Sequence, residues 1–133
     1  MTTDEIHLFA KNLMEEVWEP FDSAKLADFY HPDVVGHHRS QTIGYKDLEN
    51  RLAWDRKNRQ SQKFQITDVI AEKDRFSIRF VFTTLELQTM QNSEIEVIYF
   101  YHLRDNKISE FNSVLQPPSE KEMLEVFAKA ELK

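Results

Sequence analysis

The segment Ile95–Leu103 has apolar side chains at both alternating sets of positions, and this pattern limits how the chain can fold. Successive side chains of a β-strand point to opposite faces of its sheet. A strand that is apolar on both faces must be covered on both. We therefore expect helices over one face of the sheet and a second subunit over the other. The first face would carry Ile95, Val97, Tyr99, Tyr101 and Leu103, and the second Ile98, Phe100 and His102.

The length and composition of the chain exclude several classes of function. With 133 residues, the sequence predicts a single domain over positions 1–133. The net charge is −6 and no basic cluster occurs, which argues against nucleic acid as a partner. No apolar run approaches the length of about 20 residues that a transmembrane helix needs, so we expect no membrane partner. The absence of cysteine excludes disulfides and zinc–thiolate sites.

The first residues, Met1–Glu5, are acidic and polar. A secretory signal peptide would instead begin with positive charge followed by an apolar stretch. Together with the lack of cysteine, this start leads us to expect a cytoplasmic protein.

Apolar residues at helical spacing predict three helices in the first half of the chain. The first should begin at a capping box made by Thr2 and Glu5. It should end near Glu19, because Pro20 lacks the N–H that a continuing helix needs. The second and third helices are expected from Asp22 or Ser23 to Tyr30, and from Tyr45 to Arg59.

A short strand, Asp33–Arg39, is expected between the second and third helices. Gly36 within it permits either a close approach of another segment or a bulge. Because strand side chains alternate, the neighbouring His37 and His38 must point to opposite faces. The sequence does not decide which of the two faces the interior.

From Lys63 onward the apolar residues recur with a period of two, which predicts four antiparallel strands in a meander. The turn Arg104–Lys107 joins the last two, and Asn106 can adopt the positive φ that such a turn requires. The fold class is therefore α+β, with a curved, mostly antiparallel sheet wrapped around three helices and an extra C-terminal helix. The strands are expected near residues 64–70, 75–88, 95–103 and 108–115, and the final helix near 119–130.

Three stretches of the chain form a recognisable combination: Phe29–Val35, Tyr99–Leu103 and Arg104–Phe111. Together they resemble the NTF2-like superfamily, and within it the SnoaL-like branch, with Asn106 where the family usually has glycine. The resemblance covers most of the chain and implies a cone-shaped fold with a cavity inside. Members include ketosteroid isomerases, polyketide cyclases, dehydratases, epoxide hydrolases and binding proteins without catalytic activity, so this fold does not specify a function.

The resemblance assigns roles to four positions of this chain. His38 falls where the isomerases have a general-base aspartate, and histidine can transfer protons near neutral pH. Tyr99 falls where they have an acid that donates a hydrogen bond, and its hydroxyl can do the same. Met14 stands in place of their second donor, a tyrosine. Ser113 stands in place of the acid/base aspartate of the cyclases, and serine cannot take up a proton near pH 7. Isomerase and cyclase chemistry by the usual routes are therefore both disfavoured.

Tyr99 and Tyr101 share the face that lines the cavity in this family, which predicts a pocket for an apolar ligand with a carbonyl or hydroxyl group. Alternatively, both rings fill the core while their hydroxyls reach the cavity mouth or backbone carbonyls. His38 is likewise either an acid/base or a hydrogen-bonded residue of the cavity wall. The predicted pocket is lined by Tyr30, Trp54, Tyr101, Phe111 and Ser113, with His38 and Tyr99 as the catalytic residues.

The histidines raise the possibility of a metal site, since zinc and iron favour two or three histidines with a carboxylate. The candidates His31, His37, His38 and His102 form no His-x-His or His-Glu-x-x-His motif. His37 and His38 also point apart if they lie on a strand. We therefore predict no metal and no cofactor.

Two classes of function stay open. The first is a small hydrophobic-ligand pocket protein acting as an isomerase, cyclase or dehydratase, with His38 as acid/base. The second is a non-catalytic binding or interaction module whose sheet serves dimerisation. Trp54 is expected either at the rim of the cavity or in contact with another subunit.

Ile98 and Phe100 point away from the tyrosines, and exposing them in a monomer would leave a large apolar patch. We therefore expect a homodimer through a patch that also includes Val81, Leu85 and Leu87.

Overall fold

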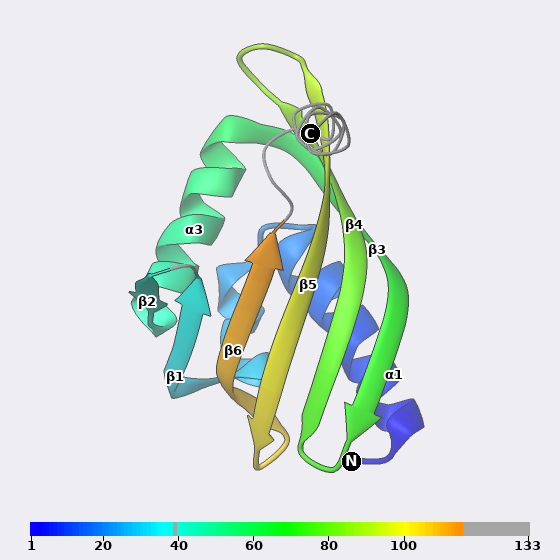
Figure 1. The fold of residues 1–133 in the computed structure, drawn as a ribbon. Helices are drawn as coiled ribbons and strands as arrows, with labels where there is room; N and C mark the ends of the chain where they lie inside the picture. Colours follow the sequence, from blue (N-terminus) through cyan, green and yellow to red (C-terminus); the bar gives the residue numbers. More distant parts are fainter. Residues whose placement is uncertain (39, 116–133) are drawn as a thin grey trace, which may run out of the picture.

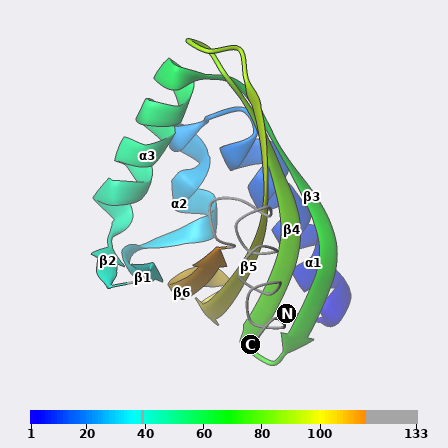
Figure 2. The ribbon, with the colours of Figure 1, turned by 45° about the horizontal axis from the view of Figure 1, so that its top comes forward.

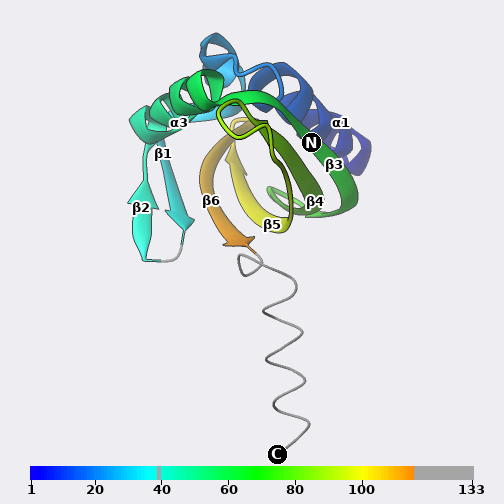
Figure 3. The same ribbon diagram turned by 90° about the horizontal axis from the view of Figure 1, so that it is seen from above.

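Six strands form one mixed sheet, and the helices lie on one side of it (Figure 1, Figure 3). The computed structural model describes residues 1–38 and 40–115 of the chain. The strand order is β2-β1-β6-β5-β4-β3, in which β1 and β6 are parallel and each other neighbouring pair is antiparallel. The strands are β1 (Tyr30–His38), β2 (Gln41–Ile43), β3 (Arg59–Glu72), β4 (Arg75–Glu86), β5 (Asn92–Arg104) and β6 (Lys107–Leu115).

The last four strands form the predicted meander, in which each strand pairs with the next along the chain. The β5–β6 turn has positive φ at both Asp105 (52°) and Asn106 (63°). Two successive positive φ values characterise the type I′ turn, whose twist suits a tight hairpin. Asn106 thus supplies the backbone conformation for which the family uses glycine.

The first helix begins at the predicted capping box. The Thr2 hydroxyl accepts a hydrogen bond from the Glu5 backbone N–H, and the Glu5 carboxylate accepts one from the Thr2 N–H. The helix ends near Glu19 as predicted, but its last turn is a π-helix, in which the Glu19 N–H donates to the Met14 carbonyl. The helices are α1 (Thr3–Leu13), the π-turn η1 (Met14–Trp18), the 3₁₀ turn η2 (Ser23–Lys25), α2 (Leu26–Phe29) and α3 (Tyr45–Asn58).

Two strands in the first half differ from the sequence expectation. β1 begins at Tyr30 rather than Asp33, and Pro32 lies within the stretch where its register with β6 shifts. A proline is tolerated at such an irregularity because the regular ladder is already interrupted there. β2 was not predicted, since three residues are too few to reveal a period. The expected C-terminal helix at 119–130 lies outside the described residues.

The sheet has an inner face toward the helices and an outer face away from them (Figure 2). Side chains of β5 alternate between these faces as the sequence predicts: Val97 and Tyr101 are buried on the inner face, whereas Phe100 on the outer face is 48% exposed. Val114 of β6, also on the outer face, is 56% exposed. In the single chain, the helices therefore cover one face of β5 and leave apolar side chains exposed on the other.

Gly36 allows the parallel contact between β1 and β6. It pairs with Phe111, and a Cβ atom built on Gly36 would lie only 2.0 Å from Cζ of the Phe111 ring. The phenyl ring therefore occupies the space that any side chain at position 36 would need. Of the two alternatives for Gly36, the close approach is the one found.

We predict that Gly36→Ala destabilises the protein, because the new methyl group would overlap the Phe111 ring. Overpacking of this kind costs about 1–3 kcal/mol, and we expect a loss of about 2 kcal/mol in the free energy of unfolding. Urea denaturation followed by circular dichroism measures it.

Gly44→Ala is the matched control, since a Cβ there would meet its nearest neighbour, Asp47 Oδ2, at an ordinary 3.8 Å. Gly44 is the N-cap of α3, so this change should cost less than about 1 kcal/mol. Equal losses in the two variants would contradict the close packing at Gly36.

Candidate active site

Three polar side chains meet on the inner face where β1, β6 and β5 lie side by side. The strand registers place His38 opposite Ser113, and Ser113 opposite Tyr99. The His38 Nδ1 atom lies 2.7 Å from the Ser113 Oγ atom, and the Ser113 and Tyr99 hydroxyls are also hydrogen-bonded. We call this row the His38–Ser113–Tyr99 chain. Its members are half-buried, so they are reachable from solvent but shielded from bulk water.

Burial raises the pKa of the Tyr99 phenol, and the hydrogen bond from Ser113 opposes part of this increase. The Tyr99 hydroxyl therefore stays protonated at neutral pH and can donate a hydrogen bond. The Ser113 hydroxyl has one hydrogen, so it can donate either to the Tyr99 oxygen or to His38 Nδ1. In the first arrangement Ser113 Oγ accepts from His38 Nδ1–H, and the His38 Nε2 atom is left as the proton acceptor.

The other predicted aromatic residues lie behind this chain and are part of the core. Tyr101 is 2% exposed and stacks between Phe76 and Tyr99, with ring centroids 4.7 Å and 5.4 Å away. Tyr30 and Phe111 are also buried, and the Tyr30 hydroxyl accepts a hydrogen bond from Trp18 Nε1 at 3.3 Å. Burial raises the pKa of both Tyr30 and Tyr101. These placements match the alternative in which the rings fill the core, and a contact with ligand stays a prediction.

Trp54 lies on the exposed side of α3, with 47% of its surface accessible. The guanidinium groups of Arg51 and Arg59 lie 5.2 Å and 5.3 Å from its ring centroid, within the range of a cation–π contact. The structure thus places Trp54 beside two cations, and its contact with a ligand or a second subunit stays a prediction.

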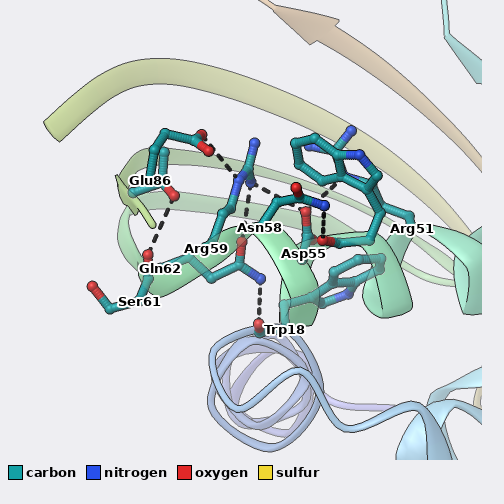
Figure 4. Close-up of polar contacts among 10 residues, drawn as sticks. Trp18, Arg51, Asp55, Asn58, Arg59, Ser61, Gln62 and Glu86 are labelled. Carbon is teal, nitrogen blue, oxygen red and sulfur yellow. Dashed lines mark hydrogen bonds and ion pairs between the residues drawn. The ribbon is translucent and has the colours of Figure 1, made fainter. Parts of the chain in front are cut away.

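A buried polar network joins α3 to β3 and to the end of the first helix (Figure 4). Asp55 is 2% exposed and accepts a hydrogen bond from Arg51 Nε at 3.0 Å, while Arg59 Nη1 lies 3.4 Å from the same carboxylate. Arg59 also donates to the side-chain oxygen of Gln62, whose amide donates to the Trp18 carbonyl. The network therefore ties α3 to β3 and to the end of the first helix, and the positive charge of its Arg51 tends to lower the pKa of Tyr99.

Burial raises the pKa of Asp55 and lowers that of Arg59, while their mutual attraction opposes both changes. Asp55 lies four residues from both Arg51 and Arg59, and on an exposed helix surface such pairs are worth a few tenths of a kcal/mol each. Both pairs form, but Asp55 and the Arg59 side chain are buried. Nothing in the local helical pattern could have shown this burial.

The remaining histidines are separated from the candidate site. His37 lies on the outer face, with Nε2 3.8 Å from a Glu110 carboxylate oxygen, and His31 bonds to the Arg104 carbonyl. The question left open by the sequence is thereby answered: His38 faces inward and His37 outward. Within residues 1–38 and 40–115, no group of three or more His, Asp or Glu side chains is placed to hold a metal ion.

A hollow of about 520 Å³ lies between α1 and β3, away from the His38–Ser113–Tyr99 chain. None of the residues predicted to line a ligand pocket borders it, so a pocket at Tyr99 stays a prediction. No helix in the described part of the chain is long and apolar enough to cross a membrane.

Residues 10–111 match the family model of the SnoaL-like domain. The chain belongs to this family. The matched region contains His38, Trp54 and Tyr99, and it ends just before Ser113. As a SnoaL-like protein, the chain is related to proposed polyketide cyclases and hydroxylases.

Solved structures share the fold at low sequence identity. AclR, a proposed hydroxylase from Streptomyces galilaeus, superposes with a TM-score of 0.78 at 17% identity, over 98% of this chain and 94% of that one. IdmH, a proposed polyketide cyclase from Streptomyces antibioticus, gives 0.73 at 15% identity over 88% and 96%. A Catenulispora acidiphila protein with a ketosteroid isomerase-like fold, in complex with trimethylamine, gives 0.69 at 12% identity over 80% and 83%. No match was found among curated proteins.

We predict that neutral His38 carries its hydrogen on Nδ1, because Ser113 Oγ accepts it. The ¹⁵N chemical shifts of the two ring nitrogens distinguish the tautomers, and Ser113→Ala should abolish the bias toward Nδ1–H. His37, whose Nε2 lies 3.8 Å from a Glu110 oxygen and not beside a serine, should keep its shifts in Ser113→Ala and so serves as the internal control. An Nε2–H tautomer in the unmodified protein would contradict the inferred direction of the hydrogen bonds.

Proposed function

We propose that this SnoaL-like protein binds a small, largely apolar molecule with a carbonyl or hydroxyl group and transfers a proton on it through His38. The reaction class is that of an isomerase, cyclase or dehydratase. The observation that carries the proposal is the His38–Ser113–Tyr99 chain, which joins a histidine to a protonated phenol across three strands. Such a pairing of a proton acceptor with a hydrogen-bond donor is what proton abstraction next to a carbonyl requires.

The chain of hydrogen bonds gives each residue a distinct role. His38 Nδ1–H donates to Ser113 Oγ, which orients the imidazole and leaves Nε2 to accept a proton from the carbon beside the substrate carbonyl. Ser113 donates to the Tyr99 oxygen, so the Tyr99 hydrogen is available to the substrate oxygen as negative charge develops there. The imidazolium then returns the proton to another atom of the substrate, and the enzyme regains its starting state.

In this mechanism the protein transfers a proton without the acid/base groups that the isomerases and cyclases use. Ser113 stands where the cyclases have an aspartate, and here it would position His38 rather than take up the proton itself. Met14, at the position of the isomerases' tyrosine, is buried in the core and has no hydrogen to donate. Tyr99 would therefore be the main donor to the substrate oxygen.

The relatives support this class of function without specifying the substrate. IdmH and AclR are described as a proposed polyketide cyclase and a proposed hydroxylase, and another protein of this fold has trimethylamine bound. A SnoaL-like fold thus accommodates a small organic molecule in at least one relative. The ligand of the present chain would be more apolar, given the aromatic residues around Tyr99.

A second candidate function is a dimeric, non-catalytic interaction module. It is favoured by the exposure of Phe100 and Val114 on the outer face, where Ile98 pairs with Val114 across β5 and β6. A twofold contact of this face with a second copy would bury these side chains. Dimerisation is also compatible with catalysis, because His38 and Tyr99 lie on the opposite face of the sheet.

We predict that His38→Ala lowers the rate of proton exchange by at least about 100-fold, the lower range for loss of a general base. The measurement is hydrogen–deuterium exchange at the carbon beside the carbonyl of a panel of hydrophobic cyclic ketones, followed by ¹H NMR in D₂O. His37→Ala is the matched control, and its rate should be unchanged because His37 lies on the outer face. Equal exchange in His38→Ala and the unmodified protein would remove His38 from the mechanism.

We also predict a homodimer that Phe100→Glu converts to monomers, since the substitution places an unpaired charge within the apolar contact. Sedimentation velocity at tens of micromolar protein distinguishes the two states. Leu8→Glu, the same change at an exposed residue of α1, should remain dimeric. A monomeric unmodified protein at these concentrations would refute the dimer and leave the catalytic proposal intact.

A further inference from the structure

The hollow between α1 and β3 lies at the opposite margin of the sheet from the His38–Ser113–Tyr99 chain. β1 lies next to one edge of the six-stranded sheet, and β3 forms the other edge beside α1 (Figure 1, Figure 2). The hollow has a volume of about 520 Å³, within the range of about 300–1,000 Å³ that is typical of small-ligand sites. It is lined by His7, Leu8, Lys11, Met14, Glu15, Phe64, Ile66 and Val69.

Among the described residues, side-chain hydrogen bonds join the end of the first helix to the beginning of β3. The Phe64 N–H donates to a Glu19 carboxylate oxygen at 2.9 Å, and the Gln62 amide donates to the Trp18 carbonyl. Farther along, the register of β3 with β4 shifts between Ile66 and Asp68, a bulge that bends a strand. The beginning of α1 and the end of β3 therefore enclose a space that their own side chains do not fill.

The chemistry of the lining is divided between an apolar floor and a charged rim. Met14, Phe64, Ile66 and Val69 supply the floor from the first helix and from β3. His7, Lys11 and Glu15 follow one another at intervals of four residues along the first helix, over about 12 Å at 1.5 Å per residue. Along the rim, His7 thus lies at one end, Lys11 in the middle and the Glu15 carboxylate at the other end.

The Lys11 ammonium group is available to a ligand. Among the described residues, neither Lys11 nor His7 forms an ion pair with an acidic side chain. Lys11 precedes Glu15 by four residues, which is the less favourable order for an intrahelical pair. A ligand carboxylate at this position could accept hydrogen bonds from Lys11 and His7 together.

We infer that the hollow binds a medium-chain aliphatic carboxylate, a site independent of the proposed active site. The carboxylate lies between Lys11 and His7, and the hydrocarbon chain lies along Ile66, Phe64 and Met14. Glu15 repels a carboxylate at the far end and thereby selects one orientation of the ligand. The apolar floor and the two neighbouring nitrogen donors both correspond to this class of molecule.

The test is a titration of the ¹⁵N-labelled full-length protein with decanoate, kept below its micelle-forming concentration. Amide shifts should change at His7–Glu15 and Phe64–Val69, and should be unaffected at His38 and Ser113. Lys11→Gln should weaken binding about fivefold, as expected for a single ion pair near the surface. Lys25→Gln removes the same charge from an exposed residue outside the hollow, and its affinity should equal that of the unmodified protein.

A second variant and two ligands of matched length complete the test. Leu8→Gln replaces an exposed apolar residue of the lining and should also weaken decanoate binding, without altering the fold. Decanol and decylamine should bind more weakly than decanoate. The inference is overturned if decanoate fails to bind, if it shifts the amides of β1 and β6 instead, if decylamine binds more tightly, or if Lys11→Gln binds as well as Lys25→Gln.

Discussion

The parallel pairing of β1 with β6 is the constraint on which the candidate active site depends. It brings together His38 and Ser113, which are 75 residues apart in the chain, and it requires the Phe111 ring to lie directly over Gly36. A shift of one residue in this register would turn His38 outward and His37 inward. The contact at Gly36 therefore helps to set the register of β1 against β6. That register decides which histidine lies beside Ser113 and Tyr99 on the inner face.

The two margins of the sheet are organised in different ways. Near β1, polar side chains from three adjacent strands form one row, and buried aromatic rings behind them keep Tyr99 protonated. Near β3, polar contacts from Glu19 and Gln62 attach the first helix to the edge strand at one point and leave a hollow beyond it. The buried Asp55–Arg59 pair lies at the end of α3, where that helix leads directly into β3.

Much of the fold followed from the period of the apolar residues. Alternation in β5 correctly assigned Val97 and Tyr101 to the covered face and Phe100 to the exposed one. The same rule placed His37 and His38 on opposite faces. It could not show which of them faces inward, because alternation shows which residues share a face but not which face is covered by the helices. The resemblance to SnoaL-like proteins made that choice for Tyr99, which lies opposite Ser113 on the inner face of the sheet.

By itself, the sequence determined the alternating faces and the helix caps, since each depends on residues near one another in the chain. It left open whether Gly36 marks a bulge or a close approach, because the contact is with Phe111 on a distant strand. The tertiary structure alone decided that β1 pairs with β6, that Ser113 bridges His38 and Tyr99, and that Asp55 is buried. It also decided that the hollow lies at Lys11 rather than at Tyr99. These features arise from contacts between distant segments, whose registers depend on the packing of the whole sheet and leave no periodic signal in any one segment.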